Sequence, residues 1–377
     1  MIPCQRDLFD IPDDVAYFNC AYMSPLLRAA ADAGDAGLRR KSRPWGISPA
    51  DFFNETDAAR GLFSRLINAS ADDIAVIPSA SYGLAVAAAN MVVNPGQKML
   101  VLAEQFPSNV YPWRDLAREK GATLTTVERP EDGDWTAAIL RAIDADTALA
   151  ALPHCHWTDG GIIDLVEVST ALRGVGAALV VDVTQSLGAL PLDVQAVRPN
   201  FLSAACYKWL MGPYSIGFLY AAPEHQAGRP IEHNWASRAN AEDFSGLVNY
   251  EDAFMRGARR FDVGERSNFA LLPAAMEAIK QLLIWGVPEI QQTLRAMTND
   301  IAAKAGELGL SSIPSNLRAG HFLGLRFPGG IPKGLAERLA AERVYVSVRG
   351  DSMPVTPHVY NAQSDIDKLF GVLGSVV

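Results

Sequence analysis

The sequence has few cysteines, no long apolar run and no excess of basic residues, and each of these absences excludes a class of protein. Its four cysteines stand apart, without CxxC spacing, which argues against a disulfide framework and against a zinc site. No stretch of about eighteen apolar residues is present, so we expect no membrane-spanning helix and no membrane partner. The net charge of −9 supplies no basic face, so we expect no nucleic-acid partner.

The chain begins with MIPCQRDLFDIPDD, which has no basic start followed by an apolar stretch. A secretory signal is therefore not predicted, and a cytoplasmic location is expected. Hydrophobic residues make up 49% and charged residues 20% of the 377 residues, which is typical of a globular protein. A chain of this length is longer than a domain with a single hydrophobic core usually is, so two lobes are expected.

Short β-rich segments alternate with helical ones between about residues 74 and 221. The apolar strand AALVVDV shows no polar alternation, as expected for a parallel strand covered by helices on both faces. From about residue 265 the pattern changes to long helices with two further strands, HFLGLRF and VYVSVR. We therefore predict an α/β fold with a large domain over residues 16–264, built on a mostly parallel sheet. A smaller α+β domain is predicted over residues 265–377, together with residues 1–15.

Ligands of open α/β sheets bind at the carboxyl ends of the strands, and two residues there are informative. Asp182 ends the run AALVV, and Lys208 follows the next short apolar run. A carboxylate beside an aromatic nitrogen base keeps that nitrogen protonated, and a desolvated lysine forms an imine with an aldehyde. Either residue alone is readily explained as a helix cap or a surface charge, but together they indicate a site for pyridoxal 5′-phosphate.

The segments DVTQSLGALPLDV and CYKWLMGPYSIGFLY resemble the Asp-x-x-Gln and lysine segments of class V aminotransferases, a branch of the fold-type-I pyridoxal phosphate enzymes. YFNCAYMSP, FDVGERSNF and VTPHVYNAQSDID are also similar to segments of that family. The resemblance implies that Lys208 carries the cofactor as a Schiff base and that Asp182 partners the pyridinium nitrogen. It also implies that Gln185 lies near the ring hydroxyl and Tyr22 near the substrate.

The resemblance assigns other residues to the cofactor pocket. Ala80 and Ser81, in PSASYGLAVAA, open a helix that would bind the phosphate, although a serine there also serves as a simple cap. Phe106 falls at the position of an aromatic side chain that stacks on the ring. Trp157 stands where desulfurases carry asparagine, a feature closer to the kynureninase-like branch. Tyr207 replaces a histidine that touches phosphate in relatives, and its hydroxyl is expected to take over that contact.

Two histidines, His154 and His156, flank Cys155 in HCHWTDGG. No third ligand accompanies them at a useful spacing, so no metal site is predicted. Whether one of these imidazoles lies near the cofactor, or neither does, stays open.

The family's homodimers place their active sites at the subunit boundary, so the resemblance implies a homodimer with shared sites. Ser267 or Asn268, in GERSNF, would then reach the phosphate bound to the partner subunit. The alternative is that these residues cap the helix that begins near Phe269.

The family's arginine for the substrate α-carboxylate should fall at position 354, where this chain has Pro354. Arg349 lies five positions earlier, at the expected end of the strand VYVSV. We therefore expect either that Arg349 takes over this contact or that recognition of the substrate does not depend on an α-carboxylate. A structural ion pair is the other explanation for Arg349.

The predicted substrate is an amino acid or a related amine, and transamination is the first expectation. A carbon–sulfur or Cβ lyase of the selenocysteine-lyase or kynureninase-like kind, or an epimerase, is the alternative. Persulfide-forming desulfurase chemistry is not expected, because the C-terminal third contains no cysteine. A fold-type-I scaffold that only binds a partner is less consistent with the retained lysine. A NAD-dependent oxidoreductase is disfavoured because no GxGxxG follows the first strand.

Overall fold

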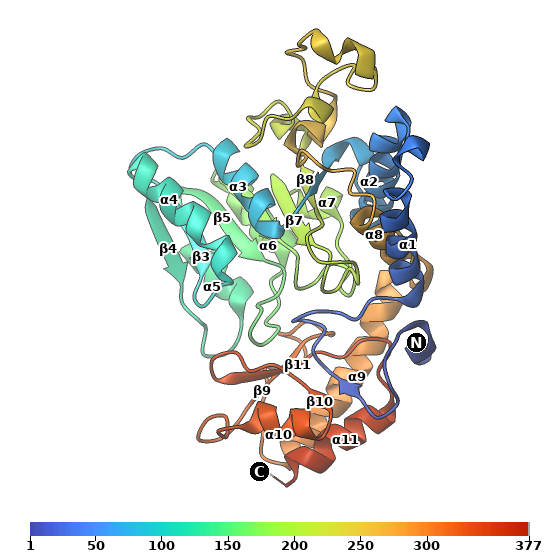
Figure 1. Ribbon diagram of the computed structural model, residues 1–377. Coiled ribbons are helices and arrows are strands. Elements are labelled where there is room, and N and C mark those ends of the chain that lie inside the picture. The colour runs from blue at the N-terminus through green and yellow to red at the C-terminus, as the bar shows by residue number, and fades with distance from the viewer. Residues whose placement is uncertain (376–377) are drawn as a thin grey trace.

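The computed structural model describes residues 1–375 and contains a large and a small lobe (Figure 1). The large lobe is built on a seven-stranded sheet with the order β2-β8-β7-β6-β5-β3-β4. Its strands are β2 (Ile74–Ile77), β3 (Lys98–Leu102), β4 (Thr123–Val127), β5 (Thr147–Pro153), β6 (Ala178–Asp182), β7 (Phe201–Ala205) and β8 (Gly217–Ala221). All of them except the edge strand β4, whose sequence is TLTTV, lie within mostly apolar runs, and the sheet confirms the predicted α/β fold.

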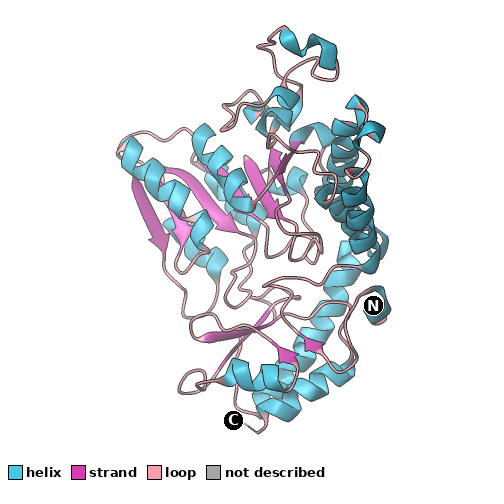
Figure 2. Cartoon of the chain, viewed as in Figure 1, coloured by secondary structure: helices cyan, strands magenta, loops and turns pink. Residues whose placement is uncertain are grey.

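Strands β7, β6, β5, β3 and β4 run parallel, whereas β8 is antiparallel to both of its neighbours, β7 and β2. Helices cover both faces of this sheet (Figure 2). Consecutive strand residues therefore enter different cores: Val181 joins one apolar cluster and Val180 the other. Because both faces of the inner strands are buried, these strands read as nearly continuous apolar runs, whereas β4 at the edge is only partly buried.

The helices of the large lobe connect the strands or pack beside the sheet. They are α1 (Arg28–Arg40), α2 (Asn54–Ile67), α3 (Ala80–Asn90), α4 (Tyr111–Lys120), α5 (Trp135–Ala142), α6 (Leu165–Gly174) and α7 (Val194–Val197). Short 3₁₀ turns lie at Arg6–Leu8, Pro44–Gly46, Pro49–Phe52, Ala71–Asp73, Pro107–Asn109, Pro223–His225, Trp235–Ser237, Phe244–Val248 and Gly257–Phe261. The last four lie within residues 222–264, a stretch without α-helices or strands.

The small lobe combines both ends of the chain. Strand β1 (Ala16–Tyr17) pairs in parallel with β10 (Val344–Tyr345), and β9 (Leu323–Arg326) pairs antiparallel with β11 (Ser352–Val355). The helices α9 (Val287–Glu307), α10 (Leu335–Ala341) and α11 (Gln363–Leu373) cover these strands. Their shared apolar core includes Ala16 and Phe18, so the N-terminal segment is part of this lobe's packing.

Helix α8 (Leu271–Trp285) contacts α1 and α2 of the large lobe, and Gly286, with φ +78°, joins it to α9. The domain boundary placed at residues 264 and 265 stays a prediction. No helix within residues 1–375 is long and apolar enough to cross a membrane.

The segment VYVSVR differs from its prediction as one strand. Only Val344 and Tyr345 are in β10, and the chain then turns at Gly350, where φ is +60°. The second strand, β11, contains Pro354 opposite Gly324. A proline without an N–H donor is tolerated there because β11 lies in a two-stranded sheet, where every strand has a free edge. Arg349 therefore lies in a turn rather than at a strand end.

Candidate active site

A cavity of about 250 Å³ lies where the carboxyl ends of the parallel strands meet. Its walls come from the segments that follow β2, β3, β5, β6 and β7. The lining side chains include Ser79, Ala80, Ser81, Phe106, Asn109, Cys155, Trp157, Asp182, Thr184, Gln185, Tyr207, Lys208 and Tyr214. Eight residues predicted from the sequence are thus brought together around one cavity.

Lys208 and Asp182 are the charged groups of this wall. Lys208 is only 5% exposed, and burial lowers the pKa of its amine to about 8, with a further contribution from the charge of Arg349. Burial also raises the pKa of Asp182, against hydrogen bonds from Thr184 that favour the carboxylate. The backbone N–H of Thr184 donates to Asp182 Oδ1 at 2.9 Å.

Asp182 has no ion-pair partner among the described residues. A buried carboxylate without a cation costs several kcal/mol in order-of-magnitude terms, so it favours a ligand with a protonated nitrogen. The ring nitrogen of pyridoxal phosphate meets this requirement. The buried carboxylate and the low-pKa lysine together show that the residues present fit this cofactor.

The opposite end of the cavity is the start of α3. Ser79 caps this helix, with its Oγ accepting the Tyr82 N–H at 3.2 Å, so the cap lies one residue before the predicted pair Ala80 and Ser81. Ser81 Oγ is 2.8 Å from Ser79 Oγ. The first N–H groups of a helix have no partner within the helix and carry partial positive charge. This end of the cavity is suited to a phosphate.

Two aromatic residues form one side of the cavity. The rings of Phe106 and Trp157 meet edge to face with centroids 5.4 Å apart, and Lys208 Nζ lies 5.3 Å from the centre of the Phe106 ring. Trp157 Nε1 donates to the Glu104 carbonyl at 2.6 Å. Phe106 therefore lies where a ring held between Lys208 and Asp182 could stack.

Gln185 and Tyr207 also line the cavity, but their contacts differ from the simplest expectation. The Gln185 amide already donates to the Ala21 carbonyl at 3.1 Å and accepts from Trp209 Nε1 at 3.1 Å. Tyr207 packs against Tyr214 with ring centroids 4.7 Å apart. The predicted contacts of Gln185 with a ring hydroxyl and of Tyr207 with phosphate stay predictions.

Arg349 lies beside the cavity and is 9% exposed. It donates to the carbonyls of Trp157 and of Ala21, the latter at 2.9 Å, and its guanidinium lies 5.0 Å from the centre of the Trp157 ring. Within the described chain it has no carboxylate partner, so the structural ion pair considered for it does not form. Burial lowers its pKa to about 10, which leaves it cationic at neutral pH. The neighbouring Tyr22 is 59% exposed.

Ser267 and Asn268 lie outside this cavity, in a separate groove with Leu38, Phe52, Trp235 and Phe269. Asn268 Oδ1 accepts the N–H groups of Ala270 and Leu271 at 3.1 and 2.9 Å. Asn268 therefore binds the first N–H groups at the start of α8, whose N-cap position is Ala270, in line with the alternative interpretation of GERSNF. The contact of Ser267 or Asn268 with the phosphate bound to the partner subunit stays a prediction.

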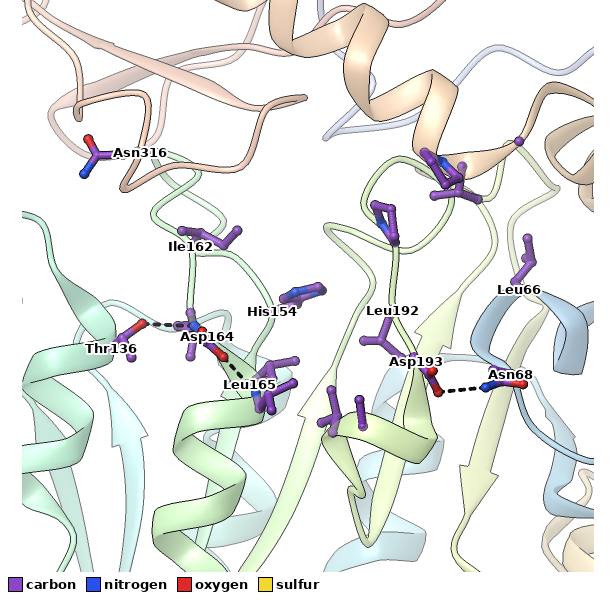
Figure 3. A pocket seen from close by; sticks show the side chains of 18 of the residues that line it. Leu66, Asn68, Thr136, His154, Ile162, Asp164, Leu165, Leu192, Asp193 and Asn316 are labelled. Carbon is purple, nitrogen blue, oxygen red and sulfur yellow. Dashed lines mark hydrogen bonds between the residues drawn. The ribbon is translucent and has the colours of Figure 1, made fainter.

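The two histidines both turn away from the cavity. His154 points into a larger cleft of about 820 Å³ between the lobes (Figure 3). Three aspartates of that cleft, Asp134, Asp164 and Asp193, are used as N-caps of helices. His156 is fully buried, and its Nε2 lies 3.0 Å from the Ala103 carbonyl. The described residues that line the larger cleft include no lysine, so this cleft offers no amine that could form an imine.

Two functional candidates escaped sequence reasoning. Asn109 is 1% exposed and lines the cavity, and its amide nitrogen has no hydrogen-bond partner among the described residues. The Cys155 thiol, which also lines it, donates to the Gln185 carbonyl at 3.3 Å. Burial raises the pKa of this thiol. Asn109 belongs to the segment after β3, so its position was a usable signal, whereas nothing in the sequence distinguishes the direction of Cys155 from that of His154.

Comparisons with known proteins agree with this geometry. The model of the family Aminotransferase class-V matches residues 49–361. An uncharacterised aminotransferase of Bacillus subtilis, YcbU, is 26% identical, over 92% of this chain and 89% of its own. A probable cysteine desulfurase of Pyrococcus abyssi is 25% identical, over 85% and 83%. The solved apo structure of a cysteine desulfurase from Thermococcus onnurineus superposes with a TM-score of 0.87 and 20% identity, covering 100% of this chain and 99% of that one.

Proposed function

The chain belongs to the class-V aminotransferase family, a family of pyridoxal phosphate enzymes, and we propose that it transfers the amino group of an amino acid or a related amine. The observation that carries the proposal is the buried pair of Lys208 and Asp182 at the carboxyl edge of the sheet. When bound, the cofactor supplies an aldehyde that captures the amine and a ring that accepts electrons from the bond being broken.

Lys208 is proposed to hold the cofactor and to move protons. With its pKa lowered to about 8, a much larger fraction of this amine is neutral near pH 7 than for an ordinary lysine. A neutral amine is a nucleophile and a base, so the same Nζ can attack an aldehyde and later accept a proton. Asp182 is proposed to keep the ring nitrogen protonated, because opposite charges stabilise each other in a buried site.

The remaining wall is proposed to orient the cofactor. The N-terminus of α3, with Ser79 and Ser81, would bind the phosphate. The amide nitrogen of Asn109, to which no described residue is hydrogen-bonded, offers a further donor. Phe106 would stack on one face of the ring. These contacts would hold the cofactor ring with its nitrogen beside Asp182. The face of the ring that Phe106 does not cover would then stay open to the substrate.

Arg349 is proposed to bind the substrate α-carboxylate. Its guanidinium is buried and bonded only to backbone carbonyls among the described residues, so it is a cation without a counter-ion. Pro354, where the family's arginine was expected, lies in β11 and has no donor. Exposed Tyr22 would contact the substrate from the mouth of the site.

A homodimer with shared sites is proposed for the assembly, and the groove of Ser267 and Asn268 supports it. Leu38 and Trp235, which both line this groove, are 65% and 39% exposed. Exposed apolar side chains that gather in one groove are typical of an interface. A cytoplasmic location is also proposed, since Cys4, Cys20, Cys155 and Cys206 are all unpaired.

A carbon–sulfur lyase is the second candidate, favoured by the similarity to the probable cysteine desulfurase of Pyrococcus abyssi. The cavity supplies one thiol, that of Cys155, and burial holds it protonated. Such a lyase would therefore release its sulfur product without passing it through a reactive thiolate in the cavity.

Identification of products separates the two reactions. The purified holoenzyme is incubated with a panel of amino acids and amines, with and without a 2-oxo acid as acceptor. Transamination predicts that the acceptor gains the amino group of the donor. Release of sulfide or of a carbon fragment without any change in the acceptor would contradict transamination and support the lyase.

A further inference from the structure

Arg129 lies outside the cavity and contacts both loops that carry its aromatic wall. Its Nε and one terminal nitrogen donate to Glu104 Oε2 at 3.1 and 2.6 Å, in the loop after β3. Its other terminal nitrogen pairs with Asp159 Oδ2, and a further bond of 3.0 Å reaches Thr158 Oγ1, both in the loop after β5. One guanidinium thus joins two loops that are distant in the sequence.

These loops connect Arg129 to the substrate side of the cavity. The Glu104 carbonyl accepts the indole N–H of Trp157 at 2.6 Å, and Phe106 follows two residues after Glu104. The carbonyl of Trp157 in turn accepts a hydrogen bond from Arg349, whose guanidinium lies over the indole ring. A continuous series of contacts therefore runs from Arg129 through Glu104 and Trp157 to Arg349.

The contacts of Arg129 stabilise two energetically unfavourable features of these loops. Glu104 has φ +54°, a left-handed conformation that a side-chain residue keeps only when its surroundings fix it. Asp159 is 1% exposed, so its charge must be paired. Without Arg129 the cation left to it among the described residues would be Arg326, a longer contact of 3.5 Å to a side chain that is 38% exposed, beside a hydrogen bond of 3.1 Å from the Gly161 N–H. His156, 3.9 Å away, is not a cation at neutral pH, because burial lowers its pKa to about 4. Loss of Arg129 should therefore release both loops.

We propose that Arg129 is a positioning residue that fixes Trp157, and through it orients Arg349 toward the substrate carboxylate. The inference rests on the proposed function for the role of Arg349. The coupling of the two loops is a property of the protein without ligand and can be measured separately.

The test compares Arg129→Ala and Arg129→Lys with Arg118→Ala, a control that removes an exposed pair with Asp115 on α4. In the holoenzyme, absorbance titration gives dissociation constants for an α-amino acid and for its decarboxylated amine. We expect Arg129→Ala to raise the dissociation constant of the amino acid about tenfold and that of the amine less than about twofold, with partial recovery in Arg129→Lys. In an Arg349→Met background, Arg129→Ala should not further change the ratio of these two dissociation constants.

Hydrogen exchange of the protein without substrate supplies the independent readout. Arg129→Ala should speed exchange in residues 103–106 and 154–161, whereas Arg118→Ala should not. If Arg129→Ala does not fold, Trp157→Phe carries the same test with a smaller expected effect, because it removes the indole N–H that binds the Glu104 carbonyl, together with the five-membered ring that bears it.

Equal weakening of both ligands, or effects that simply add to those of Arg349→Met, would show a structural role alone and overturn the proposal. Unchanged exchange in both loops would overturn it as well. A wild-type holoenzyme that responds to no amine would instead refute the proposed function, and the exchange data would still decide the role of Arg129.

Discussion

Replacing Arg349 with methionine removes the proposed carboxylate contact while keeping an apolar side chain of similar length. Hydrogen bonds to charged groups contribute about 1.5–3 kcal/mol, so the dissociation constant of an α-amino acid should rise roughly 10-fold to 100-fold. The matching decarboxylated amine should bind almost as before. Because the pKa of Arg349 is about 10, the difference should persist across neutral pH.

The variant also leaves two backbone carbonyls, those of Ala21 and Trp157, with fewer hydrogen-bond donors. The Ala21 carbonyl still accepts from Gln185 at 3.1 Å, whereas the Trp157 carbonyl loses the bond from Arg349. A fall in stability of about 1 kcal/mol is therefore expected, and thermal unfolding measures it.

Absorbance titration of the holoenzyme with matched amino acids and amines provides the assay. Arg343→Met is the control, because Arg343 belongs to the same lobe but is 47% exposed and paired with Asp14 at 2.8 Å. The reasoning is refuted if Arg349→Met weakens the amine as much as the amino acid, or if tight amino acid binding survives the change.

Three further predictions concern the cofactor and the assembly. Asp182→Asn should retain the cofactor but lower turnover by several orders of magnitude, since an unprotonated ring accepts electrons poorly, and steady-state kinetics with unchanged turnover would remove Asp182 from the mechanism. Because the pKa of Lys208 is lowered to about 8, capture of the cofactor by the apoprotein should speed up about tenfold per pH unit below that value and level off above it. Stopped-flow rates that keep rising toward pH 10 would contradict this. Light scattering should give the mass of a homodimer, and a fully active monomer would argue against shared sites.

The sheet could be predicted because a strand that is buried on both faces appears in the sequence as a continuous apolar run. Strands β6 and β7 are apolar at every position apart from Asp182 and Ser203. A run of this kind indicates a buried parallel strand, and this inference does not depend on the conformation of the loops. The same reasoning placed Asp182 and Lys208 at one edge. Strand β11 was missed, because its four residues contain a proline and its pairing with β9 depends on a turn at Gly350.

The directions of side chains beyond the strand ends were less accessible to prediction. Cys155 enters the cavity while its neighbour His154 enters the other cleft, and nothing in the letters HCHW distinguishes the two. Glu104 adopts a positive φ, a conformation that the sequence usually indicates by a glycine, and no glycine is present at this position. This turn determines the path of the chain before Phe106. Asn268 binds the first N–H groups at the start of α8 within the chain, a local choice that family resemblance alone did not decide.

The most direct test of the central claim is to find where the cofactor is attached. The protein purified with pyridoxal phosphate is reduced with borohydride, digested, and mapped by mass spectrometry. The account predicts that the pyridoxyl group lies on Lys208, in the peptide containing CYKWLMG, and that Lys208→Ala abolishes the labelling. A pyridoxyl group on another lysine, such as exposed Lys41, with Lys208 unlabelled, would contradict it.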